Sequence, residues 1–585
     1  MLSSGKPLPD DSMAATHSPA QIETSRRSGA RSKEPVTQEG KACASRNALR
    51  THGPGARLVR LSPALILGGA EFDRGRRVQR CSAPAANEDE GTMATALKDP
   101  RIQLSDQLLF REQCYVDGEW IGAEDGKTIK VTDPATGEVI GTVPSIGVAE
   151  TRRAIEAAER ALPAWRARTA KERSAVLRKW FELVIANADD LAYLMTREQG
   201  KPLAEAKGEV GYGASFLEWF AEEAKRIYGD VIPQTVASRR LLVIKQPVGV
   251  CAAITPWNFP NAMIARKVGP ALAAGCTMVV KPASSTPYSA LAMAELAERA
   301  GVPAGVFSVV TGSSGPIGVE LCTNKTVRKV SFTGSTEVGK ILLKQCADTV
   351  KRTSMELGGH APFIVFDDAD LDKAVEGAMA CKFRNAGQTC VCTNRIYVQA
   401  GVYDAFAEKF AAAAGTLRVG PGTAKDVTVG PLIDDAAVAK AQEHVDDARA
   451  KGARVMIGGK QHQLGGRFFE PTILANCDGA MKIAHEETFA PVAPLFRFET
   501  EEEVIRLAND SDVGLAGYFF ARDLGRVFRV AEALEVGMVG VNDGVISVEV
   551  APFGGIKESG MGREGSKYGV EDYLEIKYVS LGGIG

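Results

Sequence analysis

The sequence lacks any long apolar run, any excess of one charge and the cysteine density of a disulfide scaffold. Its longest uncharged apolar runs, such as 61–70, fall short of the roughly 20 residues that a membrane helix needs. With 70 Lys+Arg against 72 Asp+Glu, no overall positive field draws nucleic acid or an anionic membrane. We therefore expect neither as a partner, and any phosphate binding must be local.

Eleven cysteines in 585 residues, with no secretory apolar segment at the amino terminus, indicate free thiols in a reducing compartment. The length suggests three or four domain-sized units. Residues 1–92 differ from the rest, because they are rich in Ser, Ala, Gly and Arg and have few aromatics. We expect a disordered extension there, with Met93 opening the folded chain.

That extension leaves two localisations open. A cytoplasmic protein is our main interpretation, and a mitochondrial one follows if the extension is a transit peptide. The acidic residues Asp10, Asp11 and Glu23 count against a transit peptide.

Apolar spacing predicts how the rest of the chain is organised. Helical spacing begins near Val148, and from Leu241 short apolar runs alternate with helices. The runs are LLVIK, VGVCAAI, TMVVK, VFSVV and KVSF, with one helix expected over 285–299 and another starting at Ser335. This alternation predicts a parallel, doubly wound sheet of the kind that binds nucleotides. A second alternating region, from APFIVF at Ala361 to GMVGVN, predicts another α/β domain.

Two turns could hold a phosphate or a nucleotide. No G-x-G-x-x-G follows the first strand, but FTGSTEVG places Gly334, Ser335 and Gly339 where a helix opens. In KPASSTP, Lys281 stands at the end of a strand, where doubly wound sheets bind ligands. Taken alone, a glycine turn between a strand and a helix is more often structural, and a lysine at a strand end is more often merely solvated.

The segment FRNAGQTCVC, 383–392, carries two thiols, Cys390 and Cys392. No second Cys or His pair with zinc spacing exists, so we expect no metal. A single thiol is more often buried and inert, but Cys390 becomes a nucleophile if a base or a field lowers its pKa. Glu356 in MELGG is a candidate base.

From about Asp106 to its end, the sequence resembles the aldehyde dehydrogenase superfamily, and within it the succinate-semialdehyde dehydrogenase branch. The blocks that carry the resemblance stand in family order: TPWNFP (255–260), KPAS (281–284), FTGSTEVG (332–339), MELGG (355–359), GQTC (387–390), EETFAPV (486–492) and PFGG (552–555). The resemblance implies an α/β fold with a doubly wound NAD(P)-binding domain (106–228 and 248–357), a catalytic domain (358–558) and oligomerisation strands (229–247 and 572–585).

The resemblance also implies a set of catalytic roles. Cys390 attacks the aldehyde, Asn258 and the Cys390 N–H stabilise the oxyanion, and Glu356 activates the water that hydrolyses the thioester. The cofactor, NADP or NAD, is expected to contact Trp257, Lys281, Ser284, Gly334, Ser335, Gly339, Leu357, Glu487 and Phe489. Ser284 replaces the Glu that NAD-selective members tend to carry, which favours acceptance of NADP.

The substrate expected from the resemblance is succinate semialdehyde, with Arg266, Arg384 and Ser547 on its carboxylate. Glutarate semialdehyde or another carboxylated aldehyde is the alternative, because one methylene discriminates weakly. A cofactor-independent thiol hydrolase and a non-catalytic binding protein are less favoured. We further expect a homotetramer or homodimer, and consider a Cys390–Cys392 disulfide as a redox switch or Cys392 as a packed thiol.

Overall fold

The computed structural model describes residues 102–584, so the expectations for residues 1–92 and for Met93 lie outside the described part. Within residues 102–584, no helix combines the length and the apolar character needed to cross a membrane. The nine cysteines in this range are all free.

The first large sheet, within residues 102–584, has the strand order β2-β1-β9-β8-β7-β10-β11-β21. Its strands are β1 (Cys114–Val116), β2 (Glu119–Ile121), β7 (Val250–Ile254), β8 (Thr277–Lys281), β9 (Phe307–Val309), β10 (Val327–Thr333), β11 (Arg352–Glu356) and β21 (Gly560–Met561). The central strands from β9 to β11 run parallel, and β1, β2 and β21 are antiparallel at the edges. This confirms the predicted parallel, doubly wound sheet.

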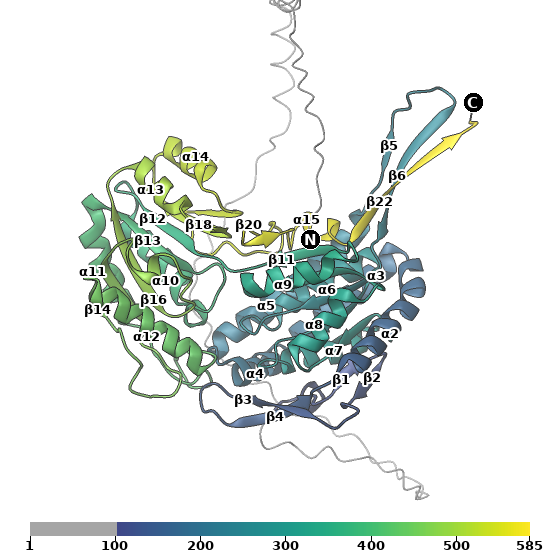
Figure 1. Ribbon diagram of the computed structural model, residues 1–585, viewed down its shortest axis with the longest axis horizontal. Helices are drawn as coiled ribbons and strands as arrows, with labels where there is room; N and C mark the ends of the chain where they lie inside the picture. Colours follow the sequence, from purple (N-terminus) through teal and green to yellow (C-terminus); the bar gives the residue numbers. More distant parts are fainter. Residues whose placement is uncertain (1–101, 585) are drawn as a thin grey trace, which may run out of the picture. The chain divides into compact units, whose positions relative to one another are not determined.

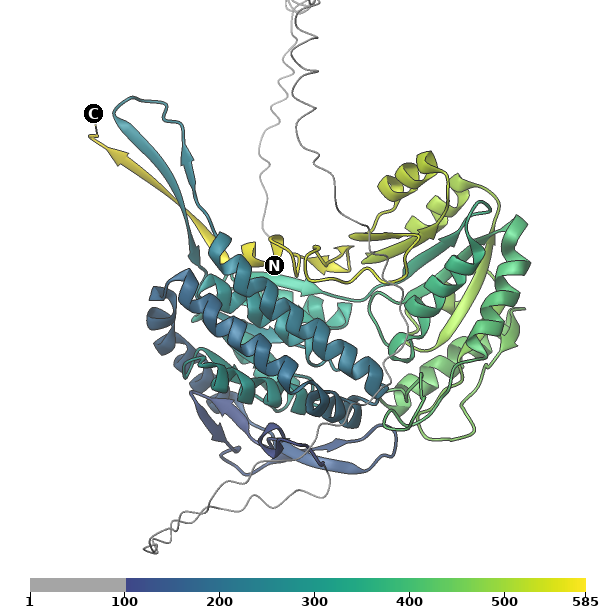
Figure 2. The same cartoon turned by 180° about the vertical axis from the view of Figure 1, so that it is seen from behind.

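Helices cover both faces of this sheet. Successive residues of a strand point to opposite faces and therefore pack into two different hydrophobic cores. In β7, Cys251 and Ala253 join one core, whereas Val250 and Ala252 join the other. The helices are α2 (Val148–Ala167), α3 (Ala170–Ala186), α4 (Ala188–Gln199), α5 (Leu203–Glu223), α6 (Ala262–Ala274), α7 (Tyr288–Ala300), α8 (Ser314–Thr323) and α9 (Thr336–Ala347). Figure 1 shows α8 and α9 in front, and Figure 2 shows the helices of the opposite face.

The second large sheet also lies within the described residues, in the order β14-β15-β16-β13-β12-β18-β19. It comprises β12 (Ala361–Val365), β13 (Thr393–Gln399), β14 (Arg454–Ile457), β15 (Thr472–Cys477), β16 (Val492–Phe498), β18 (Ala516–Phe520) and β19 (Met538–Val541). Only β14 is antiparallel. Its helices are α10 (Leu371–Phe383), α11 (Tyr403–Ala414), α12 (Asp435–Ala450), α13 (Glu501–Asn509) and α14 (Leu524–Ala533). The second α/β unit is thus confirmed.

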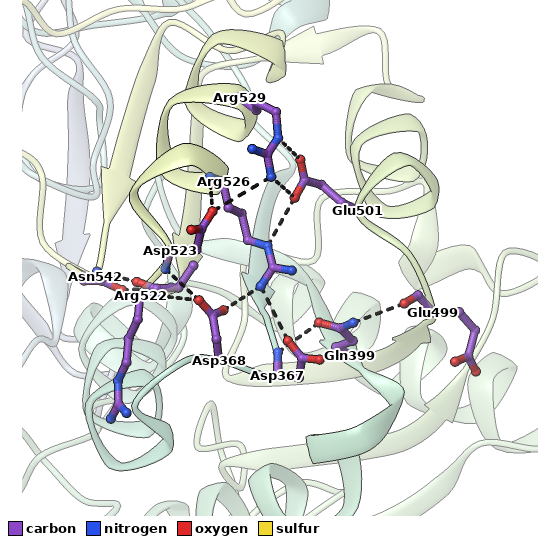
Figure 3. Close-up of polar contacts among 11 residues, drawn as sticks. Asp367, Asp368, Gln399, Glu499, Glu501, Arg522, Asp523, Arg526, Arg529 and Asn542 are labelled. Atoms are coloured by element: carbon purple, nitrogen blue, oxygen red, sulfur yellow. Dashed lines mark hydrogen bonds and ion pairs between the residues drawn. The ribbon is translucent and has the colours of Figure 1, made fainter.

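Charged side chains join α13 and α14 to the turn after β12 (Figure 3). Arg526 lies 2.6 Å from an oxygen of Asp368 and 3.1 Å from one of Glu501, and Arg529 lies 2.7 Å from Glu501. Pairs this close to solvent contribute about 1 kcal/mol or less each. The network therefore orients helices at the rim of the second sheet more than it stabilises the fold.

A separate antiparallel sheet of β5 (Asp230–Ile232), β6 (Arg239–Pro247) and β22 (Leu574–Gly582) corrects one prediction. The run LLVIK, 241–245, was expected to open the parallel series, yet it lies in β6. An apolar run of five residues does not reveal which sheet it joins. Figure 1 shows these three strands extending away from the parallel sheet.

The remaining elements are short. They are the hairpin β3 (Thr128–Thr132) and β4 (Val139–Pro144), the pair β17 (Val513–Gly514) and β20 (Ile556–Lys557), the helix α15 (Tyr568–Glu571), and the single turns η2 (Gln107–Leu109), η3 (Ala224–Arg226), η4 (Arg384–Gly387), η5 (Ala400–Val402) and η6 (Lys482–Ala484).

Candidate active site

Cys390 lies in a turn between η4 and β13, as the sequence predicted. The chain reaches it through three successive residues with left-handed backbone: Asn385 (φ 52°), Ala386 (φ 55°) and Gly387 (φ 76°). Such a conformation is costly for residues other than glycine and persists only where the surroundings enforce it. The turn brings the partly exposed Cys390 to the wall of two cavities.

Cys390 lines both of these cavities. The smaller, of about 20 Å³, is bounded by Tyr212, Phe259, Met263, Arg266, Arg384, Thr389, Cys390, Val391, Ser547 and Phe553. The larger, of about 280 Å³, is bounded by Pro256, Trp257, Asn258, Thr333, Gly334, Ser335, Leu357, Gly358, Cys390, Lys440, Glu487 and Phe489. The structure thus places all three expected substrate residues in one cavity and seven of the expected cofactor and catalytic residues, besides Cys390, in the other.

Asn258 comes from the loop after β7 and is buried. Its Nδ2 donates to the carbonyl of Gln388 at 3.1 Å, and its Oδ1 has no hydrogen-bond partner among the described residues. An amide nitrogen carries two hydrogens, so the bond to Gln388 leaves one of them free. Asn258 and Cys390 line the same cavity, which makes the pair suitable for binding an oxyanion formed at the thiol.

Glu356 ends β11 and is 3% exposed. Neither of its carboxylate oxygens has a hydrogen-bond partner among the described residues. Burial, with a further contribution from the charge of Glu564, holds the pKa of Glu356 well above its ordinary value. The ionised form of such a group is a stronger base than an ordinary carboxylate and can take a proton from a thiol or a water.

Behind the smaller cavity, Glu564 pairs with two cations of α6. The carboxylate bonds the Lys267 ammonium, and its second oxygen lies 2.7 Å from Nε of Arg266. Arg266 is 2% exposed, and its guanidinium also stacks 3.9 Å from the Phe553 ring centroid. Arg266 therefore reaches the cavity as a member of a buried ion cluster, a role that its sequence context did not reveal.

Arg384 is placed differently. It is half-buried, and within residues 102–584 its guanidinium has no ion pair, only a contact with the Phe259 ring at 5.5 Å. Tyr212, which the sequence did not single out, adds a buried hydroxyl without a partner among the described residues. With Ser547 on the same wall, the cavity offers a cation and hydroxyl donors to an anionic group.

Burial also acts on the thiol itself. It raises the pKa of Cys390 to about 12, while the charges of Arg266 and Arg384 act to lower it. Glu356 and Glu487 lie close enough for their charges to raise it. The resting group at neutral pH is consequently a thiol, and nucleophilic attack requires a base.

The larger cavity fits a nicotinamide dinucleotide. Gly334 and Ser335 lie at the start of α9, where first-turn N–H groups attract a pyrophosphate. The rings of Trp257 and Phe489 meet edge to face at 5.7 Å, and Glu487, whose pKa burial raises to about 7, accepts from the Gly359 N–H. Lys440 of α12 completes the wall and was not predicted.

Three expected cofactor residues stand outside this lining. Lys281 is buried and donates to Ser314 Oγ at 2.9 Å, while Ser284 donates to the Gly312 carbonyl at 3.4 Å. A Cβ on Gly339 would stand 2.5 Å from Cδ2 of Leu357, so this glycine lets α9 pack on Leu357. Gly339 therefore packs against Leu357, and its expected cofactor contact stays a prediction.

Cys392 is buried, and its Sγ lies 3.5 Å from the carbonyl oxygens of Lys382 and Thr393. Burial raises the pKa of its thiol. A disulfide with Cys390 remains a prediction. Within residues 102–584, no group of His, Cys, Asp and Glu side chains is arranged to hold a metal ion.

Comparison with known proteins adds an independent line of evidence. Residues 120–579 match the model of the aldehyde dehydrogenase family. A glutarate-semialdehyde dehydrogenase of Pseudomonas putida is 70% identical over 480 residues, covering 82% of this chain and 100% of the relative. The NADP(+) succinate-semialdehyde dehydrogenase of Escherichia coli is 67% identical, covering 82% and 100%. A crystal structure described as an E. coli NADP dependent enzyme matches with a TM-score of 0.82 at 67% identity, covering 82% and 100%. The chain belongs to the aldehyde dehydrogenase family.

Proposed function

We propose that the protein oxidises succinate semialdehyde to succinate with NADP or NAD. The observation that carries this proposal is the cavity beside Cys390, because Arg384, Arg266 and Ser547 all line it together with the thiol. A carboxylated aldehyde needs such a site, because a buried carboxylate must be paired and hydrogen-bonded. The names of the relatives, succinate- and glutarate-semialdehyde dehydrogenases, agree with this chemistry.

In the proposed reaction, Cys390 Sγ attacks the aldehyde carbon as its proton passes to a base. Asn258 Nδ2 and the Cys390 N–H donate to the resulting oxyanion, an arrangement worth about 3–4 kcal/mol per donor in comparable sites. A nicotinamide held beside Trp257, Glu487 and Phe489 would supply the hydride acceptor needed to convert the thiohemiacetal to a thioester. Glu356 then removes a proton from the water that attacks the thioester, which releases the carboxylic acid and restores the thiol.

Glutarate semialdehyde is the main alternative substrate. It presents the same aldehyde and carboxylate with one more methylene, which is worth only about 1–3 kcal/mol of discrimination. A comparison of kcat/KM for the two semialdehydes with each cofactor, followed by the absorbance of reduced nicotinamide, tests the proposal. If neither semialdehyde makes that absorbance grow, the proposal is rejected. Thioester hydrolysis without any cofactor reduction would favour the cofactor-independent thiol hydrolase.

For the cofactor, we infer that NADP is accepted at least as well as NAD. Lys281 and Ser284 would face the adenosine ribose, and Ser284 offers no carboxylate to repel a 2′-phosphate. Burial lowers the pKa of Lys281 to about 8, and an incoming phosphate would favour its charged form. Ser284→Glu should shift the ratio of kcat/KM toward NAD, and a wild-type enzyme with a large NAD preference would contradict the inference.

The domain roles are proposed on the same basis. Residues 106–228 and 248–357 would bind the cofactor, 358–558 would carry the catalytic thiol, and 229–247 with 572–585 would join subunits into a homotetramer or homodimer. In support, Val231, Ile576 and Tyr578 are 60–79% exposed on the three-stranded sheet. We propose a cytoplasmic enzyme, with mitochondria as the alternative.

A further inference from the structure

The segment 199–209, which joins α4 to α5, buries an unusual set of polar side chains. Gln199 is 0% exposed, Lys201 2% and Glu209 4%, although none of them lines either cavity. A buried ion pair is weak evidence for stability, because well-packed apolar residues often serve as well. We therefore look for the role of the Lys201–Glu209 ion pair in how it positions the residues around it.

Lys201 bonds directly to the backbone of the expected oxyanion residue. Its Nζ donates to the Asn258 carbonyl at 2.7 Å and to Glu209 Oε2 at 2.5 Å. The ammonium also lies 4.1 Å from the ring centroid of Phe259. Through these three contacts, Lys201 fixes the position and orientation of the peptide group of Asn258.

Glu209 holds the other end of the same loop. Its Oε1 accepts from the N–H groups of Asn261 and Ala262, at 3.0 and 3.2 Å, where α6 begins. A carboxylate at a helix start is electrostatically favourable and satisfies donors that have no partner within the helix. Lys201 and Glu209 together anchor the loop on both sides of Phe259.

The segment grips the cysteine loop as well. Gln199 Nε2 donates to Asn385 Oδ1 at 3.1 Å, and Glu205 Oε2 accepts from the Asn385 N–H at 2.8 Å. Asn385 Nδ2 in turn donates to the Asn258 carbonyl at 3.0 Å. These bonds hold Asn385 in its left-handed conformation, five residues before Cys390.

The two loops then meet at one atom. The Gln388 carbonyl accepts from Asn385 Nδ2 at 3.2 Å and from Asn258 Nδ2 at 3.1 Å. The Asn258 amide is therefore oriented by a bond to the chain two residues before the nucleophile. A displacement of either loop would turn the amide away from an oxygen bound at Cys390.

We propose that Lys201 and Glu209, with Gln199 and Asn385, are positioning residues that set the Asn258 amide relative to Cys390. The inference rests on the proposed roles of Cys390 and Asn258. It requires that these residues affect only steps in which an oxyanion develops, and not the reactivity of the thiol itself. A merely structural role would weaken both alike.

The test uses the double variant Lys201→Met/Glu209→Gln, which removes both members of the buried ion pair together. The glutamine side chain keeps an oxygen that can accept from the N–H groups of Asn261 and Ala262. The matched control is Lys207→Met, on α5 like Glu209 but with a side chain that is 59% exposed. Thermal unfolding and circular dichroism of the full chain show whether each variant is folded.

Two reactions of Cys390 are compared, neither needing cofactor or semialdehyde. Alkylation by iodoacetamide forms a C–S bond as iodide leaves, and no oxyanion develops. Acylation by p-nitrophenyl acetate passes through a tetrahedral oxyanion before p-nitrophenolate leaves. We expect at least tenfold slower acylation in the double variant, with alkylation within twofold of wild type and the control unchanged in both.

Acylation within twofold of wild type, or equal losses in the two reactions, would overturn the inference. If the double variant does not fold, Asn385→Gly answers the same question, because glycine tolerates φ 52° and lacks the donor to Asn258. Failure of the proposed function looks different, since wild type would then react with both reagents but oxidise neither semialdehyde.

Discussion

The partly exposed Cys390 and the buried Glu356 both have a raised pKa, and for one physical reason. Removing either group from water penalises its charged form. The resting thiol is thus neutral, whereas the raised pKa makes the ionised form of Glu356 a stronger base than an ordinary carboxylate. Chemistry must then begin with a proton transfer to that ionised form. Such a pair is poised for acid–base work at the cost of a less nucleophilic resting state.

Glu356→Gln tests whether Glu356 activates the water that hydrolyses the thioester. The amide retains the volume of the carboxyl group but cannot accept a proton, so the thioester should form once and then persist. We expect a burst of about one reduced cofactor per active site, followed by turnover slowed by about 10²–10⁴-fold. Stopped-flow absorbance measures both phases, and a steady rate equal to wild type would remove Glu356 from the hydrolytic step.

Substitution of Arg384 and of Arg266 should have different effects on substrate binding and on stability. Arg384→Met should weaken kcat/KM for a carboxylated aldehyde by about 2–5 kcal/mol while sparing an uncharged aldehyde of similar length. Arg384 has no ion pair among the described residues, so its loss should leave the fold intact. Kinetics with the two aldehydes provide the measurement.

Arg266→Met provides the contrast, because it deprives the buried Glu564 carboxylate of one of its cations. Loss of one partner of a buried pair typically costs about 3–5 kcal/mol of stability. We therefore expect lower thermal stability in addition to the loss of substrate binding.

Equal losses for charged and uncharged aldehydes in Arg384→Met would mean that Arg384 supports the shape of the cavity and does not bind the substrate carboxylate.

At the scale of elements, α4 and α7 are joined by one buried carboxylate. Glu198 is 0% exposed and accepts from the N–H groups of Tyr288 and Ser289, at 2.7 and 2.8 Å, and from Ser289 Oγ. It caps the start of α7, which explains why that helix begins at Tyr288 rather than at the predicted Ser285. Burial outweighs these bonds and raises the pKa of Glu198 to about 8.

This shift predicts a pH-dependent stability. Between the ordinary value of 4.5 and about 8, the folded state binds more protons than the unfolded state, so the free energy of unfolding falls as the pH rises through that window. The loss attributable to Glu198 is at most about 5 kcal/mol. Denaturant unfolding at pH 5, 7 and 9 should show a smaller decline in Glu198→Gln than in wild type. Parallel declines in the two proteins would contradict the assignment.

The elements also show how far sequence patterns reach. TMVVK and KVSF were predictable as buried strands, because each apolar run is flanked by turn residues. The strands β15 and β18 were missed, since TILANC and AGYFF mix small and polar residues with apolar ones and their burial comes from the neighbouring strands.

At the site, Cys390 and Glu356 were predictable as candidates from their own segments, whereas Asn258 followed only from the family resemblance of its block; their catalytic roles stay predictions. Glu564 could not be found in this way. It pairs with Lys267 across 297 residues of sequence, and only the fold brings them together. Lys201 was hidden for a related reason, since a single lysine before a helix resembles an ordinary surface residue.

For the whole molecule, the three-stranded sheet predicts an assembly. Ile576→Lys replaces an apolar side chain that is 71% exposed with a charged one. The isolated subunit should lose little stability, because the position is not packed in its interior. A charge buried between subunits without a partner should disfavour association. Light scattering should show a smaller mass for the variant than for wild type. An unchanged mass would exclude this position from the interface.

The position of Cys390 on the wall of two cavities has a kinetic consequence. Apart from Cys390, the larger cavity and the arginine-lined cavity share no lining residue. In the proposed reaction, reduced cofactor would be able to leave the larger cavity while an acyl group is still attached to the sulfur, and the vacated space would admit the water that completes the cycle. Reduced cofactor should consequently inhibit without competing with the aldehyde, and its release rate should set how long the thioester survives.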